Sequence, residues 1–141
     1  MLEIVKRLDS VKKSDKIFLL GIGQGAQYAE AAACELGDKI AGMIFYYPKF
    51  EPDYFSSDFI EKCYQEDQTI SMSNYISKYR GPVMLVHGER DKVTDMDNSQ
   101  QMLGCYDNAV LNILPKESHE FSIVGRKKAI GYCTEFIEKH E

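Results

Sequence analysis

Four short apolar runs alternate with helical patterns along the chain. The runs are rich in Ile, Leu, Val, Met and Phe, and they span residues 17–20, 40–46, 83–86 and 110–114. Continuous apolar runs of this length are typical of parallel strands that are covered on both faces. Because helical patterns separate the runs, the chain predicts right-handed crossovers between the strands. We therefore expect an α/β fold, with a parallel four-stranded sheet and helices on both faces.

The segments between these runs predict the helices. The expected helices cover residues 2–13, an alanine-rich stretch that ends at Gly37, a segment around 96–105 and a last segment up to about 139. The first of them has apolar residues on one side only, as a surface helix packed on a sheet does. No repeat, low-complexity tract or linker divides the chain, and we expect a single domain over residues 1–141.

One segment, at about residues 48–80, breaks the alternation. Two prolines open it, and two short helical patterns follow at about 56–66 and 72–79. Nine of the sixteen aromatic residues of the chain lie between Tyr46 and Tyr79. From the residues alone, the plain interpretation is that these rings pack a short helical insertion onto the sheet.

Composition and charge exclude several classes of function. The chain has 44% hydrophobic and 28% charged residues, as soluble globular proteins do, and no apolar run approaches the roughly 20 residues that cross a bilayer. Its net charge of −5 and its scattered basic residues argue against a nucleic acid or an anionic membrane as partner. The first residues lack the apolar block of a signal peptide, so we expect a cytoplasmic location. The four cysteines form no C-x-x-C pair; we expect no disulfide framework and no metal site, and we assign no cofactor.

The chemistry of the chain centres on a glycine-rich turn. The sequence Gly21-Ile22-Gly23-Gln24-Gly25 follows the first apolar run and opens the alanine-rich helix. A strand, a tight turn and a helix in this order form the elbow that carries the serine of the G-x-S-x-G motif. The central position of the motif is Gly23, which has no side chain. The turn therefore resembles a nucleophile-bearing elbow from which the nucleophile is missing.

A second motif overlaps this turn. Gly21, Gly23 and Ala26 also fit G-x-G-x-x-A, the dinucleotide-binding fingerprint. A dinucleotide site needs an acidic residue near the end of the next strand to hold the ribose. That strand ends in tyrosines, and Glu51 follows too late. We keep a dinucleotide-binding domain as a less favoured alternative.

Three positions follow strands and are expected to meet at one edge of the sheet. They are Gly23, Asp91 and His119, after the first, third and fourth strands. In nucleophilic catalysis a histidine takes the proton of the nucleophile, and a carboxylate orients the imidazole and stabilises its charged form. The plainer alternatives are that Asp91 caps the next helix or holds its own turn, and that His119 is an ordinary loop histidine. His87 ends a buried strand, and we interpret it as structural.

These residues carry a resemblance to a known family. The stretches GIGQGA, PVMLVHGERDKV and LPKESHEF resemble, in this order, the C-terminal half of an α/β-hydrolase of the serine esterase type. The feruloyl or cinnamoyl esterase-like and dienelactone-hydrolase-like branch is the most similar. The resemblance implies a truncated α/β-hydrolase fold in which the segment at 48–80 is a short helical lid. In the family this lid lies over the acyl pocket, so the resemblance also implies an alternative for the aromatic residues of this segment, a pocket for an aromatic or fatty acyl group. It also implies that Asp91 is the triad acid, that His119 is the base, and that the backbone N–H of Gln24 is one oxyanion donor.

Two departures from the family bear on the function. Gly23 stands in place of the serine, and the first strands of the family, with the second oxyanion donor, have no counterpart before Met1. We therefore expect a small-molecule ester or acyl ligand with little or no ester hydrolysis. One alternative is a binding or assembly module that pairs through the edge of the first strand, as a homodimer or with a separate N-terminal half. Another is slow hydrolysis in which Asp91 and His119 activate water directly.

Overall fold

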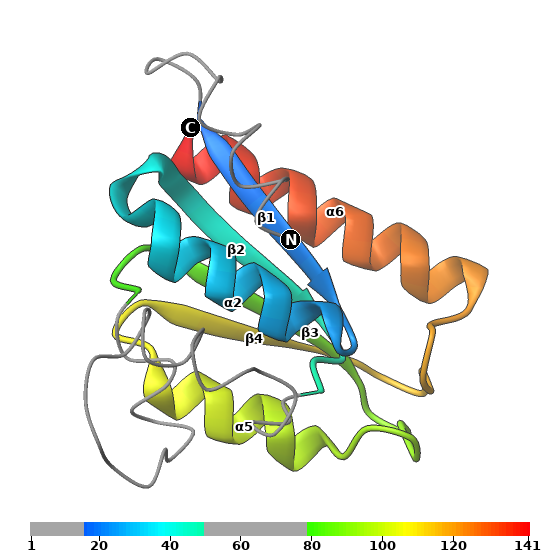
Figure 1. Cartoon of the computed structure of the whole chain (residues 1–141). Helices are drawn as coiled ribbons and strands as arrows, with labels where there is room; N and C mark the ends of the chain where they lie inside the picture. Colours follow the sequence, from blue (N-terminus) through cyan, green and yellow to red (C-terminus); the bar gives the residue numbers. More distant parts are fainter. Residues whose placement is uncertain (1–15, 50–78) are drawn as a thin grey trace, which may run out of the picture.

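The structure, a computed structural model, describes residues 16–49 and 79–141. Its elements are β1 (Ile17–Ile22), α2 (Gly25–Leu36), the short 3-10 helix η1 (Gly37–Lys39), β2 (Ile40–Tyr46), β3 (Val83–Gly88), α5 (Met96–Cys105), β4 (Ala109–Leu114) and α6 (Ile123–His140) (Figure 1). The helix expected at 2–13 lies outside the described residues. So do the two helices expected within the insertion, apart from Tyr79.

The described strands form one parallel sheet in the chain order β1-β2-β3-β4. Helices α2 and α5 cover one face, and α6 crosses the other (Figure 1). The expected parallel four-stranded sheet with helices on both faces is confirmed. The registers bring Ile22 opposite Tyr46, Tyr46 opposite Val86, and Gly88 opposite Leu114, so the carboxyl ends of all four strands lie at one edge.

Two strands extend further at their carboxyl ends than the apolar pattern indicates, and β4 begins one residue earlier, at Ala109. β1 continues through Gly21 and Ile22, and β3 continues through His87 and Gly88. The apolar runs end earlier because a glycine or a polar histidine interrupts them. Backbone pairing with the neighbouring strand continues regardless, since it needs no apolar side chain.

The core consists of two clusters, one on each face of the sheet. Alternate side chains of β2 and β3 enter each cluster, because successive side chains of a strand point to opposite faces. Met43, Phe45 and Leu85 pack under α2 and α5, whereas Ile44 and Met84 pack under α6. Every residue of β3 is buried. Burying one such side chain stabilises the fold by roughly 1.5–3 kcal/mol, so the central strands hold much of the stability.

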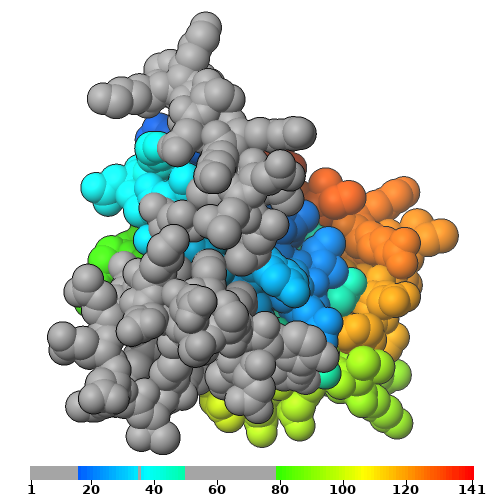
Figure 2. Space-filling view, in the orientation of Figure 1, coloured from blue at the N-terminus to red at the C-terminus, as the bar shows by residue number. Residues whose placement is uncertain are grey.

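The edge strand β1 is less completely covered. Leu20 and Ile22 are 51% and 48% exposed, although both are large and apolar. In the described part of the chain, β1 pairs with β2 alone. The space-filling view shows β1 and the start of α2 at the surface, between α6 and the residues that follow β3 (Figure 2). No described helix is both long and apolar enough to cross a membrane.

Candidate functional site

Three loops meet where the strands end. The first is the turn between β1 and α2, the second follows β3, and the third joins β4 to α6. The carboxyl edge of a parallel sheet is where ligands usually bind, because loops of independent sequence converge there. The structure places the sequence-predicted residues Gly23, Gln24, Asp91 and His119 on these loops.

The turn after β1 has the geometry of an elbow. Gly23 has a φ of +54°, a left-handed conformation that side-chain-bearing residues adopt only with strain. Its N–H donates to Tyr46 O at 3.0 Å, and its carbonyl accepts from Lys49 N at 3.0 Å. At Gly21 a Cβ atom would lie 2.6 Å from the Cα of Ala26, so only glycine lets α2 start this close to β1.

The position of Gly23 has room for a side chain. A Cβ atom built on Gly23 would meet no described atom closer than Tyr47 Cε2, at 3.9 Å. The absence of a side chain therefore does not follow from crowding among the described residues. What a substitution costs at this position is backbone strain, on the order of 1–3 kcal/mol.

Gln24 directly precedes α2. Its φ and ψ of −62° and −21° are helical, and its side chain makes no capping hydrogen bond. None of the hydrogen bonds between described residues uses the backbone N–H of Gln24. The N–H groups that begin a helix carry partial positive charge, which favours a negative oxygen nearby.

Asp91 is held in a tight turn after β3. Its side chain is fully buried, and Oδ1 accepts hydrogen bonds from the N–H groups of Val93 (2.8 Å) and Thr94 (2.9 Å). Oδ2 lies 2.8 Å from Nδ1 of His119. Burial raises the pKa of the carboxyl, but the bonds from Thr94, His119 and Val93 outweigh burial and lower the pKa below its usual value. Asp91 is therefore an anion at neutral pH.

His119 uses the ring nitrogen nearer the backbone for this contact. Because Nδ1 donates to the Asp91 carboxylate, the other nitrogen, Nε2, carries the free lone pair of the neutral imidazole. The His119 side chain is 24% exposed. It also packs on the ring of Tyr47, with 4.4 Å between ring centroids. This is the arrangement in which a histidine can accept a proton from a neighbouring group.

Backbone contacts hold the Asp91 loop against the His119 loop. Arg90 N donates to Glu117 O at 2.8 Å, and Lys116 N donates to the Glu89 carboxylate at 2.8 Å. At Gly88 a Cβ atom would lie 2.7 Å from the carbonyl oxygens of Glu117 and Ser118. Sequence reasoning missed these contacts, because nothing in the spacing of the chain shows which two loops touch.

Glu117 ties the His119 loop to α6. Its carboxylate accepts from both the N–H and the hydroxyl of Ser122, each at 2.7 Å, and Ser122 in turn caps α6 by accepting from Gly125 N at 3.1 Å. Glu120 and Phe121, next to His119, both have positive φ values. Glu117 and Ser122 hold a strained loop whose conformation determines where the histidine lies.

The structure also bears on the plainer interpretations of Asp91, as a helix cap or a residue that holds its own turn, and of His87, as a structural residue. The side chain that caps α5 belongs to Asp95, which accepts from Asp97 N at 3.0 Å, so Asp91 is not the cap of that helix. Asp91 does hold its own turn, and it contacts His119 in addition. His87 is fully buried, with Nδ1 2.7 Å from Ser99 Oγ and Nε2 3.0 Å from Thr94 O. These bonds agree with a structural role for His87.

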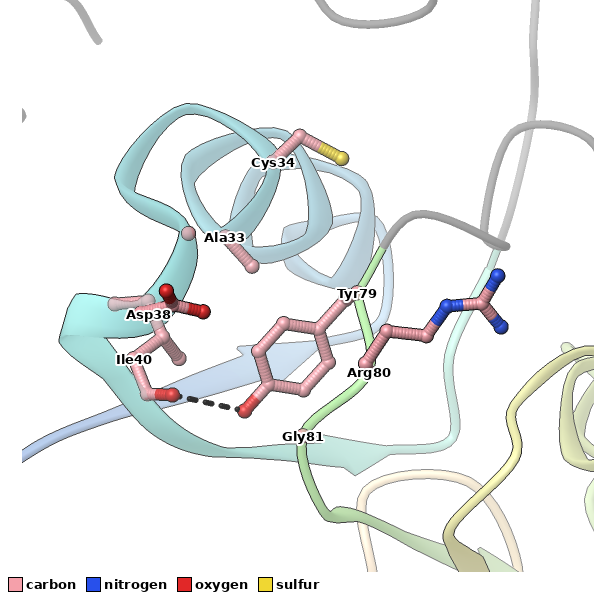
Figure 3. A pocket seen from close by; sticks show the side chains of 8 residues that line it. Ala33, Cys34, Asp38, Ile40, Tyr79, Arg80 and Gly81 are labelled. Carbon is pink, nitrogen blue, oxygen red and sulfur yellow. Dashed lines mark hydrogen bonds between the residues drawn. The ribbon is translucent and has the colours of Figure 1, made fainter.

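A pocket lies at the opposite edge of the sheet, where the strands begin. It has a volume of about 230 Å³ and lies between the end of α2 and the residues before β3. Figure 3 shows the ring of Tyr79 in it, with the hydroxyl donating to Ile40 O at 3.1 Å. Cys34 lines this pocket, at the far end of α2 from Gly23. The described residues hold no group of three or more His, Cys, Asp or Glu able to bind a metal ion.

Solved structures similar to this chain are hydrolases. Est1E from Butyrivibrio proteoclasticus, with ferulic acid bound, superimposes with a TM-score of 0.74 at 20% identity, over 99% of this chain and 65% of Est1E. A predicted CIB-like hydrolase from Thermoplasma acidophilum has a TM-score of 0.72 at 16% identity, over 98% of this chain and 57% of the hydrolase. A monoacylglycerol lipase from Paleococcus ferrophilus has a TM-score of 0.65 at 17% identity, over 99% of this chain and 72% of the lipase.

These similarities establish the fold. The chain has the architecture of part of an α/β-hydrolase, and it spans about two thirds of the length of Est1E. No protein-family model and no curated protein sequence matches the chain.

Proposed function

We propose that this chain is an esterase-related α/β-hydrolase that binds a small ester or acyl ligand and hydrolyses it slowly or not at all. The observation that carries the proposal is the hydrogen bond of 2.8 Å between buried Asp91 and His119, at the same sheet edge as an elbow whose central residue is Gly23. In this proposal Asp91 is the acid, His119 is the base, and the Gln24 N–H is an oxyanion donor.

The proposed site lacks one part of the esterase reaction. In a serine esterase, the hydroxyl gives its proton to histidine Nε2 while its oxygen attacks the ester carbonyl, and the histidine then protonates the leaving group. Here the proposed base has no side-chain hydroxyl to deprotonate at Gly23. Losing the nucleophile costs about 10⁶ in turnover, on the order of 8 kcal/mol in barrier height. A water activated by His119 recovers only about 10²–10⁴ over the uncatalysed reaction.

The test is to restore the missing nucleophile, a serine hydroxyl at position 23. We expect Gly23→Ser to hydrolyse p-nitrophenyl acetate at least ~100-fold faster than the parent, since the elbow and the acid–histidine pair are already in place. His119→Ala, made in both backgrounds, is the control and is expected to remove the gain. Turnover by the parent that depends on His119 would show direct water activation instead. Inactivity of a folded Gly23→Ser variant would contradict the proposal.

We propose a second function, assembly through β1, which rests on the exposure of that strand. Leu20 and Ile22 are about half exposed on a strand with one described neighbour, and such edges invite strand pairing. The proposed occupant is a second copy of the chain or a separate N-terminal half. We expect the parent to scatter light as a dimer at micromolar concentration and Leu20→Lys to shift it to a monomer. Ile130→Lys, on the 61% exposed Ile130 of α6, is the matched control. A monodisperse parent monomer would contradict homodimer formation.

A further inference from the structure

Tyr47 has a backbone conformation that its surroundings enforce. It directly follows β2, and its φ of +36° lies in the left-handed region. For a residue other than glycine this conformation costs roughly 1–2 kcal/mol. Its N–H donates to Val86 O at 2.8 Å, which anchors the strained residue to the end of β3. Strained residues of this kind gather at functional sites, so the direction of the side chain matters.

The ring of Tyr47 lies between the two halves of the candidate site. Its centroid is 4.4 Å from the centroid of His119 and 5.1 Å from that of Phe121. On the other side, Tyr47 Cε2 is the described atom nearest to where a Cβ on Gly23 would be, at 3.9 Å. A ring in contact with His119 and this close to Gly23 takes up space beside both positions, where an acyl group bound to the site has to lie.

The hydroxyl of Tyr47 is uncharged at physiological pH. Burial and, to a lesser extent, the nearby Glu120 carboxylate raise the pKa of the hydroxyl; Arg126 lowers the pKa by less than Glu120 raises it, and the effect of Asp91, which raises it, is the smallest. The phenol therefore stays neutral at physiological pH. The contacts of Tyr47 with His119 and with the Gly23 position are made by its ring.

From this geometry, and on the basis of the proposed function, we propose that Tyr47 is a specificity-determining residue that limits the acyl group beside His119 to a very small one. With the ring in place, we expect an acetyl group to be accepted beside His119. A longer acyl chain meets the ring itself. Removing the ring takes away its contact with His119 but leaves the hydrogen bond between Asp91 and His119 and the backbone of the elbow in place.

The proposal is tested in the Gly23→Ser background with two esters. We expect Tyr47→Gly to raise the ratio of kcat/KM for p-nitrophenyl hexanoate over p-nitrophenyl acetate at least ~10-fold, because a few methylene groups in a pocket change specificity by this order. Glycine also removes the strain of the positive φ. Tyr47→Phe keeps the ring and is expected to leave the ratio unchanged. An unchanged ratio in Tyr47→Gly, with an active parent serine variant, would overturn the proposal.

Two further variants support this test, one as a control and one as a substitute for Tyr47→Gly. Tyr132→Ala removes another ring packed on the same core cluster and is expected to leave the ratio unchanged, which separates a local effect from general loosening. Tyr47→Asn serves if Tyr47→Gly does not fold, since asparagine is small and tolerates the left-handed region. The expected increase in the ratio is the same for both small residues.

A second readout works without any esterase activity. In the parent chain, diethyl pyrocarbonate acylates the free imidazole nitrogen of His119, and peptide mass spectrometry distinguishes it from His87 and His140. We expect Tyr47→Gly to raise the rate at His119 at least ~10-fold and Tyr47→Phe to leave it unchanged. Equal rates in parent and Tyr47→Gly would overturn the proposal even if the serine variant is inert. An inert serine variant with the faster acylation would instead contradict the proposed function alone.

Discussion

The two halves of the candidate site differ in how completely the described chain builds them. At the ends of β3 and β4, a buried carboxylate and a histidine are hydrogen-bonded, and their loops are joined by backbone contacts. At the end of β1, the backbone turn is formed, but Gly23 has no side chain and the strand has one described neighbour. The comparison teaches that a turn can have the conformation of a nucleophile elbow without carrying the reactive atom. Fold similarity alone therefore does not decide activity.

The largest effect on activity is expected from a substitution of Asp91, the carboxylate at the ends of β3 and β4. In the Gly23→Ser background, Asp91→Asn leaves the shape of the turn but replaces the group that selects the His119 tautomer. We expect kcat for p-nitrophenyl acetate to fall by up to about 10⁴, and in any case to the rate of the parent chain. Asp95→Asn is the matched control, because Asp95 caps α5 and makes no described contact with His119. A fall of less than 10-fold for Asp91→Asn would show that the pair contributes little to hydrolysis.

A smaller effect, on stability, is expected from a substitution that pushes the Asp91 loop and the His119 loop apart. A Cβ at Gly88 would lie 2.7 Å from two carbonyl oxygens, so Gly88→Ala is expected to lower the free energy of unfolding in urea by ~1–3 kcal/mol. At the elbow, a Cβ on Gly25 meets no described atom within 4 Å, and Gly25→Ala is expected to change that energy by less than ~1 kcal/mol. Equal effects of the two substitutions would contradict the tight docking of the loops at Gly88.

The smallest effect is a difference in pH dependence between two buried carboxyls. Glu30 lies on α2 behind the elbow, where burial raises the pKa of its carboxyl well above 4.5, assisted by Cys34 and opposed by the hydrogen bond from Tyr106. A carboxyl whose pKa is higher in the folded than in the unfolded state stabilises the fold at pH values below its unfolded pKa. This contribution is lost as the pH rises through the folded pKa. Asp91 has a lowered pKa, so its contribution is present above the unfolded value of 3.8 and is lost as pH falls below it.

These opposite signs give a direct measurement. As the pH rises from about 4.5, we expect the free energy of unfolding of the parent to fall, because the contribution of Glu30 is lost. The free energy of unfolding of Glu30→Gln, which has no carboxyl at this position, is expected to fall less over the same pH range. The negative charge of Glu30 also raises the pKa of Tyr79 and of Cys105. The titrations of these two groups at higher pH are therefore compared in both proteins. Parallel pH profiles for the parent and Glu30→Gln would contradict a protonated Glu30 in the fold.

Much of the fold follows from the sequence, because buried parallel strands need apolar side chains on both faces. The expected strand at 40–46 and the expected helix at 96–105 match the structure at both ends. Asp91 and His119 were found from their positions after strands, since the topology of a parallel sheet brings such positions together. The role of each in catalysis remains a prediction.

Tyr47, Gly88 and Glu117 could not be found in the same way. The ring of Tyr47 reaches His119 only because the backbone turns to a positive φ after β2, and tertiary contacts impose this turn. Gly88 reads as one more small residue in a strand until the loop that approaches it is known. Contacts between loops depend on three-dimensional approach, which neither periodicity nor spacing encodes.

The chain order of the strands has a consequence for synthesis on the ribosome. Because β2, β3 and β4 each pair with the described strand made just before them, each of these three strands meets a neighbour that has already been translated. Folding can thus proceed vectorially, from the N-terminus onward. His119 leaves the ribosome after all four described strands and before α6, so its bond to Asp91 forms only once the strands of the described sheet have been translated.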